Sequence, residues 1–164
     1  MYSLLISVIA IALTVAVAAA SMYYGGDSLT QGRSAADATA YVTAAQQISG
    51  AAVMYQTTES AAPADVAALV TAGNLNGVPS VKSRSATNEW TLVAAVAGTS
   101  PRMLSINLAG APATNQKLCD TINKNAGATG MDATTGTVTA IAANPYACVP
   151  GASGTDPQVF QYKY

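Results

Sequence analysis

The sequence predicts an α+β protein: a long N-terminal α-helix, kinked or unwound near Gly25-Gly26, with a small antiparallel β-sheet head packed on its C-terminal half. Three observations predict it: an uncharged apolar run at the N-terminus, a helical repeat of apolar positions after it, and short strand-like segments in the remainder. We expect residues 1–26 to form a hydrophobic helix for a membrane or a filament core. Residues 27–57 continue it as an amphipathic helix, and residues 58–164 form the head.

The N-terminal run, Leu4 to Tyr24, contains no charged side chain, and the first charge along the chain is that of Asp27. At about 1.5 Å per residue of helix, the run spans the apolar core of a bilayer. Its alanines and β-branched residues favour close packing between helices. A cleaved signal peptide is one alternative, but the first three residues lack its positive charge. A simple membrane anchor is another, although the first basic residue is Arg33. We therefore expect the chain to start where a basic leader has been removed.

Two glycines, Gly25 and Gly26, follow this run, and each costs about 1 kcal/mol relative to alanine inside a helix. The pair predicts a helix break, after which the helix would restart with Asp27 or Ser28 as its N-cap. Further on, apolar positions recur every three or four residues and predict one stripe of an amphipathic helix. The stripe consists of Ala38, Tyr41, Ala45, Ile48, Ala52 and Tyr55. We expect the head to sit on it.

The elements of the head are predicted from turn residues and strand-like runs. A short helix, Ala64 to Ala72, is followed by Gly73 as its C-cap. Strands are expected at Trp90–Val96 and Arg102–Leu108, joined by a hairpin turn at residues 98–101, and again at Gly136–Ile141 and Gln158–Tyr164. A second helix is expected at Thr114–Asn125, with Leu118, Cys119 and Ile122 on one side.

The chain has two cysteines, Cys119 and Cys148, and both lie in the head. In a membrane-inserted, exported protein such a pair is expected to form a disulfide. The bridge would close a loop of about 30 residues and contribute roughly 3–4 kcal/mol through loop entropy. Two free, buried thiols are the alternative.

The sequence lacks the residues that several common kinds of catalytic and binding site require. The chain has no histidine, which removes Ser–His and Cys–His nucleophilic pairs and most transition-metal sites. The acidic residues are scattered, and Gly127 to Gly130 has neither the lysine nor the helix of a phosphate-binding loop. A net charge of −1 gives no electrostatic reason for nucleic-acid contact. We expect no catalytic, cofactor-binding or metal-binding residues and no cofactor, so the protein is not expected to be an enzyme.

An apolar helix, a glycine interruption, an amphipathic continuation, a sheet on that helix and a Cys-bounded C-terminal region together resemble the type IV pilin family. The resemblance covers the whole chain, is most specific from Met1 to Tyr55, and is closer to the type IVb branch of major pilins. It implies a subunit of an extracellular bacterial filament for adhesion, conjugation, or surface contact with DNA or phage. Met1 would be the N-methylated first residue. The filament core would contain Leu4, Leu5, Val8, Ile9, Ile11, Leu13, Val15 and Val17.

The resemblance also implies partners. These are identical subunits in the filament, the inner membrane before assembly, and the pilus assembly machinery. One position departs from the family, which almost always has glutamate at the fifth mature residue to neutralise a neighbouring subunit's amine. Here that position is Leu5. A minor pilin or a type II secretion pseudopilin, some of which lack the glutamate, is therefore an alternative, as are a membrane-anchored periplasmic binding module and a filamentous-phage-like coat subunit.

Overall fold

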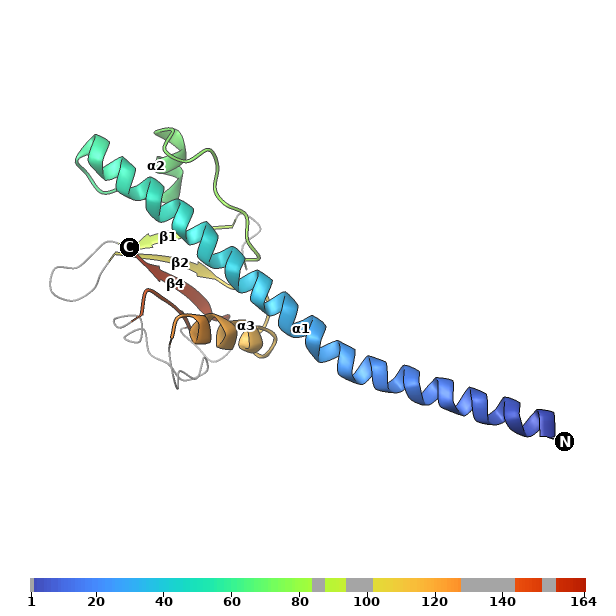
Figure 1. Ribbon diagram of the computed structural model, residues 1–164. Coiled ribbons are helices and arrows are strands. Elements are labelled where there is room, and N and C mark those ends of the chain that lie inside the picture. The colour runs from blue at the N-terminus through green and yellow to red at the C-terminus, as the bar shows by residue number, and fades with distance from the viewer. Residues whose placement is uncertain (1, 84–87, 94–101, 128–143, 152–155) are drawn as a thin grey trace. The chain divides into compact units, whose positions relative to one another are not determined.

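The computed structural model describes residues 2–83, 88–93, 102–127, 144–151 and 156–164. The chain divides into two compact units, Met1–Ser34 and Ala35–Tyr164. The long helix α1 (Tyr2–Glu59) belongs to both units. The predicted combination of a long N-terminal helix and a small antiparallel sheet on its C-terminal half is confirmed (Figure 1).

Helix α1 continues through Gly25 and Gly26, so the predicted unwinding of the helix at these residues is wrong, whereas the predicted kink stays a prediction. Asp27 and Ser28 accordingly lie inside the helix and do not begin a new one. The physical reason is that nucleation is the costly step in helix formation. Once turns exist on both sides, two glycines cost only about 1 kcal/mol each and keep their backbone hydrogen bonds. The helix ends instead at Glu59, after which Ser60 has a left-handed φ of 54°.

The C-terminal half of α1 presents the predicted stripe to the head. Ala38, Tyr41, Ala45, Ile48 and Ala52 are all buried, and Tyr55 packs partly buried against the same core. Because half of these six side chains are alanine, the helix backbone can lie close to whatever covers it. Figure 1 shows the sheet along this part of the helix.

The short helix α2 (Val66–Thr71) lies within the predicted segment and has a defined cap at each end. The Asp65 carboxylate accepts a hydrogen bond from the Ala68 N–H at 2.7 Å, which satisfies one of the free donors of the first turn. Gly73 follows the last turn with a φ of 76°, the left-handed conformation that glycine adopts without a Cβ clash. Val66 and Leu69 are buried in the core.

Four strands form one antiparallel sheet in the order β1-β2-β4-β3. They are β1 (Thr91–Val93), β2 (Met103–Asn107), β3 (Tyr146–Val149) and β4 (Val159–Lys163), with helix α3 (Pro112–Asn125) between β2 and β3 in sequence. β1, β2, β4 and α3 lie where they were predicted, and residues 94–96 of the strand expected at Trp90–Val96 lie outside the described residues. β3 was not predicted. The expected strand at Gly136–Ile141 and the expected turn at 98–101 lie outside the described residues.

The main core lies between the sheet and the helices. The Phe160 ring on β4 is its centre, with ring centroids 5.6 Å from Tyr41 and 6.2 Å from Trp90. Register explains this gathering, since Phe160 lies opposite Ile106 on one side and Cys148 on the other. The opposite face of the sheet carries a smaller cluster of Met103, Ala147 and Val149.

Candidate assembly helix and its head

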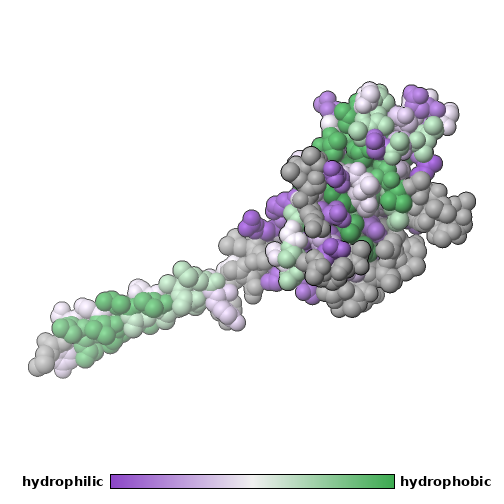
Figure 2. Space-filling model, turned by 180° about the vertical axis from the view of Figure 1, so that it is seen from behind, coloured by the Kyte–Doolittle hydropathy of each residue, from purple (hydrophilic) through white to green (hydrophobic). Residues whose placement is uncertain are grey.

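The first part of α1, Tyr2–Tyr23, is long and apolar enough to cross a membrane, and none of it is buried within the chain. By length and composition alone, a signal sequence near the N-terminus has the same properties. Figure 2 shows apolar residues along this helix, whereas the head displays a mixture of polar and apolar residues. A surface of this kind requires lipid or another protein to cover it.

All eight residues predicted for a filament core project from the helix, with exposed fractions between 50% for Ile9 and 73% for Leu4. They do not form a single stripe. Leu4 and Val8 share one face of the helix, whereas Leu13 and Val17 point roughly to the opposite side. A helix that is apolar on all sides is suited to complete enclosure, not to lying on the surface of a core.

Between Leu4 and Met22, the three hydroxyls are satisfied by the helix itself. Ser7 donates to the carbonyl of Ser3, Thr14 to that of Ile11 and Ser21 to that of Ala18, each at 2.9 Å. A hydroxyl bonded to its own helix costs less to transfer from water into an apolar medium than an unbonded one. The polar atoms here therefore do not oppose enclosure.

The start of the helix contains no acidic side chain in its first turn, and Leu5 is exposed. Met1, the residue expected to be methylated, lies outside the described residues. The predicted methylation of Met1 thus remains a prediction.

The head is closed by the predicted disulfide between Cys119 of α3 and Cys148 of β3, and the alternative of two free thiols is wrong. Their Cα atoms are 5.2 Å apart, and both side chains are buried. The bridge fastens α3 to a strand at the edge of the sheet. Its burial gives it a structural role, since an exchange reaction needs access to a sulfur atom.

A second link beside the disulfide was not predicted. The buried Asn123 side chain accepts from the Cys148 N–H at 2.7 Å and donates to the Cys148 carbonyl at 3.1 Å. Its amide thus replaces a neighbouring strand along the outer edge of β3, where unpaired backbone groups could otherwise pair with another chain. Asn123 lies one helical turn after Cys119, so both side chains project from α3 toward β3.

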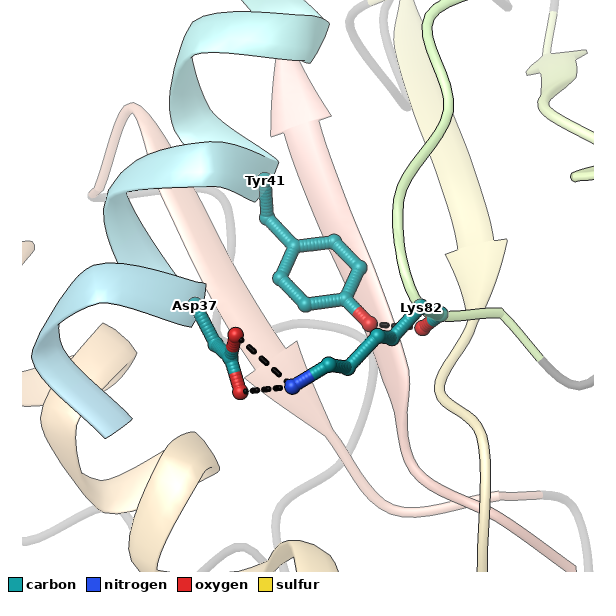
Figure 3. Close-up of polar contacts among 3 residues, drawn as sticks. All are labelled: Asp37, Tyr41 and Lys82. Atoms are coloured by element: carbon teal, nitrogen blue, oxygen red, sulfur yellow. Dashed lines mark hydrogen bonds and ion pairs between the residues drawn. The ribbon is translucent and has the colours of Figure 1, made fainter. Parts of the chain in front are cut away.

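A shallow cleft of about 290 Å³ lies between α1 and the segment Ser80–Lys82. At its rim, the Lys82 ammonium approaches the two Asp37 carboxylate oxygens at 2.8 and 3.0 Å (Figure 3). The Tyr41 hydroxyl donates to the Lys82 carbonyl. Burial, and then the Asp37 charge, raise the pKa of Tyr41 above its usual range. The two charges neutralise each other and both remain partly exposed. The cleft therefore offers no net charge that would favour an anionic or a cationic ligand.

Among the residues that the structure describes, no group of three or more His, Cys, Asp or Glu side chains could hold a metal ion. The features that the sequence did not predict, Asn123 and the Asp37–Lys82 pair, join residues 25 and 45 positions apart. The expected features that the described residues contain are the exposed apolar helix, the buried stripe and the disulfide. No protein-family model, curated protein or solved structure matches this chain.

Proposed function

We propose that this protein is the repeating structural subunit of an extracellular filament of the type IV pilus kind, which polymerises by bundling its N-terminal helices. The observation that carries the proposal is the helix Tyr2–Tyr23, which is apolar on all sides and entirely uncovered in the single chain. A bundle of identical helices covers every side of such a helix at once. The head then decorates the outside of the filament.

The energetics favour assembly in an apolar environment. Each fully enclosed Val, Leu or Ile side chain contributes about 1.5–3 kcal/mol relative to exposure to water, and the segment has nine such residues exposed by half or more. Before assembly, the inner membrane covers the same surface. In a filament, alanine and the self-bonded serine and threonine side chains permit close contact between helices.

A membrane-anchored head is the second candidate, because a lone helix in lipid also covers Tyr2–Tyr23. The two candidates differ in what the helix contacts. In a filament the helix contacts other copies of the chain, whereas an anchor contacts lipid. The presence of the chain in sheared extracellular filaments therefore separates them.

The test replaces an apolar side chain on the helix with a charge. Ile9→Lys and Val15→Asp place an unpaired charge in the bundle at a cost of several kcal/mol. We expect both variants to abolish filaments in electron micrographs of sheared cell-surface material. The head should keep its disulfide and its resistance to protease.

Two matched controls accompany this experiment. Ile9→Val keeps the site apolar and should assemble, and Gln46→Lys adds a positive charge at an exposed position of α1 in the head. Normal filaments from Ile9→Lys would overturn the proposal. Chains that reside in the membrane and never appear in filaments under any condition would favour the anchor.

A further inference from the structure

Asn76 and Gly77 lie next to each other in the exposed segment that follows α2. Asn-Gly is the sequence in which the backbone nitrogen after an asparagine is least hindered, because glycine has no side chain. A Cβ built on Gly77 would meet no atom within 4 Å, so the surrounding chain also leaves this position open.

The hydrogen bonds of this segment stop just before the pair. The backbone N–H groups of Asn74 and Leu75 both donate to the Leu69 carbonyl, at 3.0 and 3.1 Å, and so hold the start of the segment against α2. Within the described part of the chain, no hydrogen bond is formed by the Asn76 side chain or by the Gly77 N–H. The Asn76 side chain and the Gly77 backbone nitrogen are therefore not held apart by hydrogen bonds to other groups.

We propose that Asn76 is a site of spontaneous deamidation. The Gly77 backbone nitrogen loses its proton and attacks the Asn76 side-chain carbonyl carbon, forming a five-membered succinimide. The bond from that carbon to the side-chain nitrogen breaks, and the nitrogen leaves as ammonia. Water then opens the ring: attack at the side-chain carbonyl gives aspartate, and attack at the main-chain carbonyl gives isoaspartate. Neither an enzyme nor a redox partner is needed.

The modification changes the surface of the head. Each event replaces a neutral amide by a carboxylate and so makes the chain's formal charge of −1 more negative by one unit. The isoaspartate product also lengthens the backbone by one methylene between residues 76 and 77. In a filament of identical subunits, the fraction of converted chains would record the age of the material.

The experiment follows the full chain in detergent during incubation at mildly alkaline pH. Tandem mass spectrometry of peptides covering residues 74–78 distinguishes Asn76 from Asn74, and enzymatic methylation of isoaspartyl groups identifies the isomer. We expect conversion at Asn76 and none at Asn74, whose following residue is leucine. Conversion should be faster at higher pH, because the attacking nitrogen must lose its proton.

Two comparisons test whether the fold changes the rate of deamidation at Asn76. The native chain should convert about as fast as the chain unfolded in urea, because the fold does not restrain the pair. Gly77→Ala should greatly slow conversion while leaving the fold intact, since Gly77 has open space around it and no left-handed φ. Protection of Asn76 in the native chain alone, or equal conversion at Asn74, would overturn the proposal.

Discussion

Tyr41 joins three parts of the head through one side chain. Its ring packs against Phe160, and its hydroxyl donates to the Lys82 carbonyl across the cleft. The neighbouring Asp37–Lys82 ion pair is partly exposed, and such pairs contribute about 0–1 kcal/mol. The phenol, which is buried, therefore matters more for stability than the charges beside it.

The titration of Tyr41 gives a prediction about alkaline stability. Burial, followed by the Asp37 charge, raises the pKa of Tyr41 in the folded chain above the unfolded value. Burial likewise raises the pKa of Tyr164, against the opposing charge of Arg102. The folded state thus holds its protons more tightly, and the resulting stability is complete below the unfolded pKa of about 10. We expect the free energy of unfolding, measured by urea titration, to fall as pH rises above that value.

Tyr41→Phe tests whether the alkaline loss of stability is due to the titration of Tyr41. Its loss of one buried hydrogen bond should lower the free energy of unfolding by about 0.5–1.5 kcal/mol at neutral pH. The alkaline decline should become shallower, and Tyr164 should account for what remains. Asp37→Asn is the control, and it should retain most of the decline because burial is the larger cause. An unchanged decline in Tyr41→Phe would refute the assignment.

At the scale of elements, α3 and β3 depend on each other. Within the part of the chain that the structure describes, β3 pairs with one strand, β4, and the Cys119–Cys148 bridge and the Asn123 amide attach it to α3. An edge strand of four residues has few backbone bonds of its own. The covalent bridge and the side-chain amide supply what a neighbouring strand would otherwise supply.

The disulfide prediction concerns stability. Replacing both cysteines by serine should lower the free energy of unfolding by roughly 2–5 kcal/mol, measured by denaturant titration of the full chain in detergent. Alkylation without reductant should leave the mass of the native protein unchanged, since both thiols are in the bridge. A stability equal to that of the unmodified protein would show that α3 holds β3 without the bridge.

Periodic elements could be predicted from the sequence, and elements defined by distant partners could not. The repeat from Ala38 to Tyr55 predicted the buried stripe because helical spacing fixes which residues share a face. β3 was missed because its four residues, Tyr-Ala-Cys-Val, have no alternation of polar and apolar residues. The Asn123 contact could not be inferred, since nothing near Asn123 in sequence indicates Cys148. The glycine pair does not interrupt α1, because a cost of about 1 kcal/mol per glycine is small in a long helix that is already nucleated on both sides.

At the scale of the whole molecule, the two compact units differ in how much apolar surface they expose to water. The first has an apolar surface on all sides, whereas the second encloses its own core. We expect a chain beginning at Ser28 to be monomeric in water by sedimentation velocity. The full chain should require detergent or lipid, or should assemble. Polymers formed by the shortened chain would show that the helix Tyr2–Tyr23 is not the basis of association.

The position of β4 sets the order in which the head can be completed. Of the four described strands it comes last in sequence, at residues 159–163, yet it lies between β2 and β3 and pairs with both. Until those residues have left the ribosome, β2 lacks one of its neighbours, and β3 lacks its one strand partner among the described residues. Pairing of strands this distant in sequence is slow, because a long loop must close first. The chain would therefore pass through a period with an open sheet, in which its unpaired strand edges are exposed to premature association.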